Sequence, residues 1–252
     1  MNELRRVQRA MLDSAAQFRD VERVGPFSAT FARSSDHPAF NYAVPDEAAQ
    51  PSAADVAALV EIFRARDLRP RLEYVAALGP AVEPALTAAG FAPELRAPLM
   101  VLRHVDASPP PKGIELLQAV SDAHVRAAVA AQHEAYGELG EPSPEWLAGV
   151  RRSLDAGGAL ALALEASTGE AAGAGQCTPP LDGAAELTSI GVRASFRRRG
   201  IAAALTSVLA QQMREREVDL VYLTAAGESE ARIYARVGFE RIGESLYISR
   251  KA

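Results

Sequence analysis

The stretch from Glu186 to Ala202 is the most informative part of the chain, and it reads ELTSIGVRASFRRRGIA. Its first seven residues favour a strand, and the apolar positions after Gly200 favour a helix. A strand that passes into a helix through a basic, glycine-containing turn leaves several backbone N–H groups unpaired. These donors and the helix dipole together favour an anion. Gly200 also lets the backbone come close to a bulky phosphate, because it carries no side chain.

Two motifs resemble those of a known family. The turn at 197–202, RRRGIA, has neither the P-loop pattern nor the GxGxxG pattern of dinucleotide-binding turns. It resembles the pyrophosphate loop of the GNAT acetyltransferase superfamily, whose ligand is acetyl-coenzyme A; a solvated basic turn is the simpler alternative. The stretch 231–239, ARIYARVGF, resembles the family's helix that carries a tyrosine, here Tyr234, shortly before a Gly-Phe turn. The resemblance covers about residues 113–250.

Composition narrows the classes of function. The chain has 252 residues, 48% hydrophobic and 23% charged, which suits one large or two ordinary domains. Its net charge of −5 argues against a general affinity for nucleic acid or acidic membranes. Cys177 is the single cysteine, so we expect a buried small side chain rather than a nucleophile. Without a signal-like N-terminus or a run of 18 apolar residues, we predict a cytoplasmic protein, and we expect no metal.

The chain divides at a proline-rich segment. Three consecutive prolines, 109–111, supply no backbone donors and favour an extended spacer. We therefore predict an N-terminal domain at 1–108, a linker at 109–113 and a C-terminal domain at 114–252. Hydrophobic periodicity predicts helices at 4–18, 53–66, 81–89, 123–133, 144–154 and 200–217, followed by the tyrosine helix. It predicts strands at 28–32, 40–44, 71–77, 98–104, 114–118, 159–165, 171–178, 186–192, 220–224 and 245–250.

The two halves repeat each other. A shift of 148 positions sets Gly90-Phe91 on Gly238-Phe239 without gaps. The basic turn at 197–202 falls on AQPSAA at 49–54, which has neither charge nor glycine, and Tyr234 falls on Leu86. The first half therefore resembles a degenerate GNAT domain, although chance similarity between two α/β halves is the alternative. The expected fold is α/β (α+β): two GNAT-like domains, each a mixed, mostly antiparallel sheet flanked by helices, with a splayed central strand pair.

The resemblance implies how acetyl-coenzyme A would be held. The N–H groups of the turn at 197–202 would bind the pyrophosphate, and the main chain of 190–192 would pair with the pantetheine arm. A donor in that strand, most plausibly the Val192 N–H, would face the thioester oxygen. Many relatives place an asparagine where this chain has Gly227, so Ser229 is the candidate substitute. The predicted cofactor-binding residues are Ile190, Gly191, Val192, Arg197, Arg198, Arg199, Gly200, Ile201, Ala202 and Ser229.

Two residues are candidates for catalysis. Glu186 matches the strand position at which several relatives have a glutamate base, which would deprotonate an amine of pKa about 10. A surface carboxylate at a strand end is the alternative. Tyr234 would assist the departing thiolate. Its phenol has an ordinary pKa of about 10 and the thiol about 8.5, so a hydrogen bond is as plausible as proton transfer.

The acceptor is expected to be an amine. The segment 127–150 contains no lysine or arginine but has four glutamates, Glu134, Glu138, Glu141 and Glu145. These form either an acidic entrance for a cationic amine or a solvated helix face. The leading prediction is an acetyl-coenzyme A-dependent N-acetyltransferase that acts on a small-molecule or peptide amine, as a monomer or homodimer. A non-catalytic acyl-coenzyme A-binding module is the alternative, and a nucleic-acid binder is disfavoured because no aromatic stacking platform accompanies the arginines.

Overall fold

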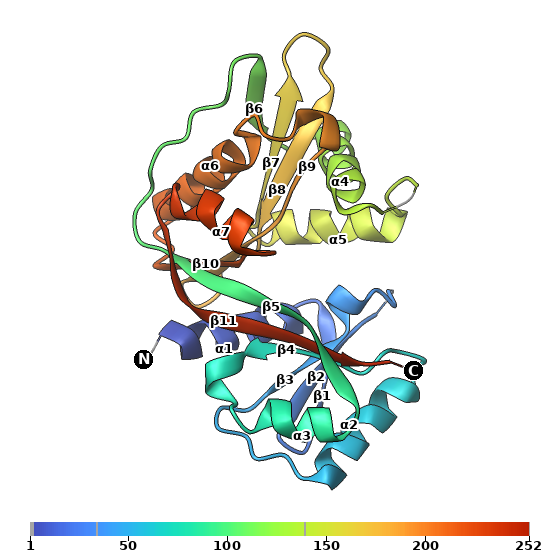
Figure 1. The fold of residues 1–252 in the computed structure, drawn as a ribbon. Helices are drawn as coiled ribbons and strands as arrows, with labels where there is room; N and C mark the ends of the chain where they lie inside the picture. Colours follow the sequence, from blue (N-terminus) through green and yellow to red (C-terminus); the bar gives the residue numbers. More distant parts are fainter. Residues whose placement is uncertain (1–2, 34, 139, 252) are drawn as a thin grey trace. The chain divides into compact units, whose positions relative to one another are not determined.

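A computed structural model describes residues 3–33, 35–138 and 140–251 (Figure 1). The chain forms two compact units, and neither is continuous in sequence. The first unit contains residues 1–99, 224–227 and 242–252. The second contains residues 100–223 and 228–241. The long strands β5 (Phe91–Leu102) and β11 (Phe239–Arg250) each begin in one unit and end in the other.

The first unit is a mixed sheet with helices packed on it (Figure 1). Antiparallel β1, β2 and β3 are followed by β4, which runs parallel to β3 and antiparallel to β11. Apolar side chains from the sheet and the helices form one core, in which Phe27, Leu59, Phe63 and Leu72 have no exposed surface. The remaining elements here are α1 (Glu3–Ala16), β1 (Arg19–Val24), β2 (Phe27–Ala32), β3 (Tyr42–Pro45), α2 (Ala53–Arg64), β4 (Arg71–Val75) and α3 (Val82–Ala88).

The second unit has the same plan. Strands β6 to β9 form an antiparallel meander, and β10 runs parallel to β9. Helices α4 and α6 lie on opposite sides of these strands (Figure 1). The apolar stripe of α6 lies in the core, because Ile201, Leu205, Leu209 and Met213 are at most 1% exposed. The elements are β6 (Ile114–Gln118), α4 (Asp122–Tyr136), α5 (Pro144–Asp155), β7 (Ala159–Glu165), β8 (Ala171–Cys177), β9 (Ala184–Val192), α6 (Ile201–Glu215), β10 (Leu220–Thr224) and α7 (Glu228–Ala235).

The predicted fold class is confirmed, and the internal repeat appears in the elements. Strand β5 begins at Phe91 and β11 at Phe239, and both have 12 residues. Helix α2 begins at Ala53 and α6 at Ile201, again 148 positions apart. The chain thus builds one supersecondary unit twice. The domain boundaries expected from the proline-rich segment stay a prediction.

Sequence periodicity failed at three strands for one reason. Strand β1, which was not predicted, has the sequence RDVERV and no buried residue, since it pairs only with β2. Strands β5 and β11 begin at Phe91 and Phe239, several residues before the predicted starts at 98 and 245. Between these positions the side chains of β5 are mostly exposed and those of β11 are exposed or half-buried, so no apolar pattern marks the start of either strand.

Candidate active site

Strands β9 and β10 part at Glu186. Their parallel pairing joins Leu220 to Ala184 and ends with Tyr222 at Glu186. Strand β9 then continues to Val192 with β8 as its ladder partner. From Leu187 to Val192 the edge of β9 that faces away from β8 is therefore open, and an open edge presents main-chain donors and acceptors. We call Leu187–Val192 the open edge.

A β-bulge distorts the open edge. Thr188 lies opposite Gln176 and Gly191 opposite Ala174, so β9 has one residue more than β8 between these pairs. Ser189 has φ +54°, in the left-handed region that few side chains adopt. The next two residues face opposite sides of the sheet. Gly191 faces α4, because a Cβ added there would lie 2.9 Å from the Ala135 Cβ. The Ile190 side chain faces α6, because a Cβ added at Gly175 would lie close to both Ile190 and Leu209.

The bulge is held by a side chain from α4. The Nε2 of Gln132 donates to the carbonyl oxygen of Ser189 at 2.7 Å. The Nε2 of Gln176 in turn donates to Gln132 Oε1 at 2.8 Å. Gln132 is only 4% exposed, so both of its amide atoms find their partners inside the protein. No sequence motif marks Gln132; the signal in the sequence is a glutamine within an apolar helix face.

Two further carbonyls of the open edge also accept side-chain hydrogen bonds. The Arg193 N–H donates to Ala172 O of β8, so the carbonyl of Val192 in the same peptide points away from β8. There it accepts a hydrogen bond from Arg197 Nε at 3.0 Å. The carbonyl of Ile190 accepts from the Tyr136 hydroxyl at 3.2 Å. With these acceptors occupied, the open edge offers chiefly N–H donors to a ligand.

The N-terminus of α6 has no side-chain cap. Its N-cap residue Gly200 has φ +90°, a conformation that favours glycine, and in the described part of the chain no side chain caps the helix. Arg198 also has a positive φ, +62°. Ile201 is buried and Ala202 half-buried at the start of the helix. The predicted pyrophosphate turn therefore ends in free backbone donors.

The three arginines of the turn have different partners. Besides Val192 O, Arg197 donates through its Nη2 to Ala135 O at 3.0 Å and so ties the turn to the end of α4. Arg199 pairs with Glu165 at 3.1 Å. Arg198 is exposed and makes no ion pair with any described residue. The main chain, more than the guanidinium groups, is thus available to an anion.

Tyr234 is buried in α7, with 9% of its surface exposed and its ring 6.4 Å from that of Phe239. Burial raises the pKa of its phenol above the ordinary value, and the nearby Tyr136 and Glu230 raise it further. A weaker acid gives up its proton less readily. The hydroxyl therefore suits hydrogen-bond donation to a developing thiolate better than full proton transfer.

Glu186 stands where the strands part. Its N–H donates to Thr178 Oγ1 and its carbonyl accepts from the Thr178 N–H, both at 2.9 Å, and its side chain is half-buried. Cys177 beside it is 1% exposed. Burial raises the pKa of the Cys177 thiol and the charge of Glu186 raises it further, so the thiol stays protonated. This agrees with a packing role for Cys177.

The remaining predicted residues lie at the surface. Ser229 is exposed at the start of α7, and its hydroxyl donates to Glu230 at 2.6 Å. Glu134 is exposed and paired with Arg193 at 2.9 Å, and Arg193 also pairs with Glu170 at 3.3 Å. Glu141 and Glu145 are exposed.

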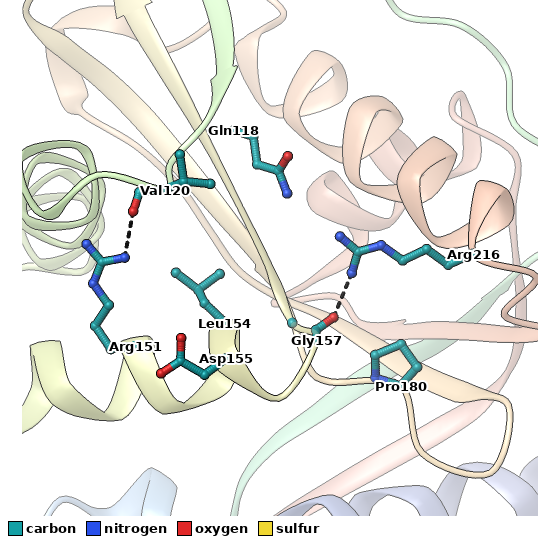
Figure 2. Close-up of a pocket in the computed structure, with 9 residues that line it drawn as sticks. Gln118, Val120, Arg151, Leu154, Asp155, Gly157, Pro180 and Arg216 are labelled. Atoms are coloured by element: carbon teal, nitrogen blue, oxygen red, sulfur yellow. Dashed lines mark hydrogen bonds between the residues drawn. The ribbon is translucent and has the colours of Figure 1, made fainter.

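A cavity of about 650 Å³ lies elsewhere in the second unit. It borders Arg216, at the C-terminal end of α6, whereas Gly200 is at the N-terminal end. A helix of 15 residues separates these ends by about 22 Å. Figure 2 shows that its two arginines are already bonded to main-chain carbonyls, Arg151 to Val120 at 2.7 Å and Arg216 to Gly157 at 2.6 Å. None of the predicted site residues lines it.

Comparison with known proteins finds a family match in the second unit. Residues 123–239 match the acetyltransferase (GNAT) family. This range contains the open edge, the turn at 197–202 and Tyr234. The similarity to the GNAT family is thus found in this segment of the chain.

Solved structures share the fold over the whole chain. A GCN5-related N-acetyltransferase from Kribbella flavida is 23% identical, with a TM-score of 0.80 over 99% of this chain and 96% of its own. A GCN5-related N-acetyltransferase-like protein from Streptococcus suis is 12% identical, with a TM-score of 0.63 over 98% of each chain. A tandem GNAT protein from the clavulanic acid biosynthesis pathway is 17% identical, with a TM-score of 0.62 over 90% of this chain and 78% of its own. No curated protein matches the sequence.

Two further findings concern metal binding and membrane-spanning helices. Among the described residues, no group of three His, Cys, Asp or Glu side chains is arranged to hold a metal ion. In the same part of the chain, every helix is too short or too polar to span a lipid bilayer.

Proposed function

We propose that the second unit is an acetyl-coenzyme A-dependent N-acetyltransferase that acts on a primary amine. The observation that carries this proposal is a difference between the two copies of the repeat. Among the described residues of the second unit, β10 does not pair with the open edge of β9, and no side chain caps α6. In the first unit, side chains fill both the gap between β3 and β4 and the N-terminus of α2.

The strand opening in the first unit is short and closed by Gln8. Strands β3 and β4 pair at Ala43 and Leu72. Just beyond this pair, Gln8 donates to Pro45 O and accepts from the Val75 N–H, both at 3.0 Å. A side-chain amide thus bridges β3 and β4 beyond their pair and fills the gap between these strands.

The helix terminus in the first unit is closed by a capping box. Ser52, the counterpart of Gly200, accepts from the Asp55 N–H, and the Asp55 carboxylate accepts from the Ser52 N–H. The carboxylate at this N-terminus supplies the negative charge that a diphosphate would otherwise bring. Only the second unit therefore offers both a donor edge and an anion site to an acyl-coenzyme A.

The residues then have the following roles. Main-chain N–H groups of 200–202 bind the diphosphate, and the open edge aligns the pantetheine arm. The amine nitrogen attacks the thioester carbon, an N–H of the open edge stabilises the oxyanion, and the C–S bond breaks. The ammonium proton leaves through Glu186 or water, and Tyr234 donates a hydrogen bond to the departing thiolate. Ser229, near the start of α7, contacts the cofactor.

The alternative is an acyl-coenzyme A-binding module without turnover. It would need the same open edge and helix terminus. It would not need Glu186 at the point where β9 and β10 part, or a buried phenol at Tyr234. Both residues are present, which favours the enzyme. The acceptor is proposed to be a small molecule or peptide, and the location is proposed to be cytoplasmic.

The test combines binding and turnover. Acetyl-coenzyme A is titrated into the protein by calorimetry, and thiol release is then followed across a panel of amines. Binding with amine-dependent thiol release is expected. Binding without release from any amine would favour the module, and no binding of any acyl-coenzyme A would overturn the proposal.

A further inference from the structure

The orientation of one peptide group in the β9 bulge is set by a side chain of α4 that lies outside the stretches 197–202 and 231–239. In a trans peptide, the carbonyl of one residue and the N–H of the next point in opposite directions. Gln132 Nε2 draws the Ser189 carbonyl toward α4 with a hydrogen bond of 2.7 Å. The N–H of Ile190, in the same peptide, must therefore point away from Gln132.

The bond is braced on both sides. Gln176 donates to Gln132 Oε1 at 2.8 Å, which fixes which end of the Gln132 amide faces Ser189. Helix α4 also packs too closely on β9 to slide, since a Cβ at Gly191 would lie 3.5 Å from Gln132 Cα and 2.9 Å from Ala135 Cβ. At the left-handed Ser189, φ +54°, an unheld peptide would relax to other orientations.

The location of this peptide matches the reacting end of the ligand. A pantetheine arm that starts at the diphosphate near Gly200 runs along the open edge from Val192 toward Glu186. Val192 therefore lies nearer the diphosphate. Ile190 lies nearer the point where β9 and β10 part, which is where the thioester would lie. The Val192 carbonyl is also bonded to Arg197 at 3.0 Å, as part of the turn itself.

We propose that Gln132, braced by Gln176, is a positioning residue for acyl transfer: it orients the Ser189–Ile190 peptide so that the Ile190 N–H donates to the thioester oxygen. The inference rests on the proposed function. It changes the expected donor from the Val192 N–H to the Ile190 N–H. A donor that is stronger toward the oxyanion than toward the ground-state carbonyl raises kcat more than it lowers Kd.

The chain offers a matched control. Gln8 on α1 is also a buried glutamine, 7% exposed, and it bonds two main-chain groups of the first unit. Gln132→Met and Gln8→Met each replace an amide by an apolar side chain of similar length. Both should lower the melting temperature by a similar amount, because both leave buried main-chain groups unpaired.

The readouts separate positioning from folding. For Gln132→Met we expect kcat to fall by about 10- to 100-fold while the Kd for acetyl-coenzyme A changes less than about threefold, since loss of a whole oxyanion donor costs about 10²- to 10³-fold. With acetyl-coenzyme A labelled with ¹³C at the thioester carbonyl, wild type should lower the carbonyl stretching frequency on binding. Gln132→Met should lose that shift, and Gln8→Met should keep both the shift and kcat.

A second variant guards against misfolding. Gln176→Met keeps the donor of Gln132 but removes its brace, and we expect a smaller fall in kcat and a broadened carbonyl band. The inference would be overturned if Gln132→Met kept the kcat and the carbonyl frequency of wild type. If Gln132→Met does not fold, the same result in Gln176→Met would overturn it. Wild type that binds acetyl-coenzyme A with an unshifted carbonyl would overturn the inference alone, whereas wild type that binds no acyl-coenzyme A would overturn the proposed function as well.

Discussion

At the scale of single residues, Tyr234 shows how burial selects among chemical roles. Its surroundings raise the pKa of the phenol, whereas a coenzyme A thiol has a pKa near 8.5. Proton transfer from the phenol to the thiolate is therefore more unfavourable than for an exposed tyrosine. The hydroxyl can still donate a hydrogen bond, which needs no change of charge on the phenol.

Tyr234→Phe should therefore lower kcat by about 100-fold, as expected for loss of one group that acts in the transition state. The Kd for acetyl-coenzyme A should change less than about threefold, because the ring that packs near Phe239 remains. Steady-state thiol release and calorimetry measure the two quantities. Wild-type turnover in Tyr234→Phe would remove the hydroxyl from the mechanism.

The raised pKa of Tyr234 also predicts a pH profile. Because burial holds the folded-state pKa above about 10, the phenol stays protonated throughout the ordinary assay range. Below about pH 10, titration of Tyr234 should therefore cause no fall in the kcat of wild type. Any fall in kcat at alkaline pH in this range should also be present in Tyr234→Phe. A fall that is present in wild type and absent from Tyr234→Phe would mean that Tyr234 titrates and acts as a general acid.

At the scale of elements, the N-termini of α2 and α6 are equivalent positions with opposite solutions. Helix α2 carries its own carboxylate at Asp55, whereas α6 has Ala203 at the corresponding position. A carboxylate there satisfies the helix dipole, and its absence leaves room for a bound anion.

Ala203→Asp should therefore stabilise α6 but repel a diphosphate. We expect an equal or higher melting temperature and an affinity for acetyl-coenzyme A at least about tenfold lower, since a like charge is placed at the anion site. Ala203→Asn is the matched control, with the same size and no charge. Equal affinity in the Asp and Asn variants would contradict an anion site at this terminus.

The capping box of α2 predicts an effect of pH on stability. Hydrogen bonds from Ser52 lower the pKa of Asp55 below its ordinary value. A lowered folded-state pKa stabilises the protein above the unfolded pKa of about 3.9, and this stabilisation is lost as pH falls through the folded value. The difference in melting temperature between wild type and Asp55→Asn should be present at pH 6 and shrink below about pH 4. A difference that is constant with pH would contradict this linkage.

At the scale of the whole molecule, the repeat predicts the number of ligands. Gln8 and the Ser52–Asp55 box occupy the first unit's strand opening and helix terminus, so only the second unit should bind. Calorimetry should give one acetyl-coenzyme A per chain. At a ligand concentration of 100 Kd the unfolding free energy should rise by about 2.7 kcal/mol. A stoichiometry of two would show that the first unit also binds.

Sequence patterns predicted the elements that are marked by apolar runs. Strands β7 and β10 have the predicted bounds, Ala159–Glu165 and Leu220–Thr224, because continuous apolar runs mark buried strands. Strand β1 was missed because its charged side chains are held only by pairing with β2. Main-chain pairing leaves no trace in hydropathy.

The sequence by itself marked the turn at 197–202, the position of Tyr234 and the repeat at 148 residues, because each can be read from the order of residues along the chain. The tertiary structure alone decided how the site is built. The Gln132 bond to Ser189 joins residues 57 apart, and the Gln8 bond to Val75 joins residues 67 apart. Whether a glutamine orients a bulge or fills a gap between strands depends on which strand lies beneath its helix. That strand is distant in the chain, so the sequence around the glutamine does not reveal it.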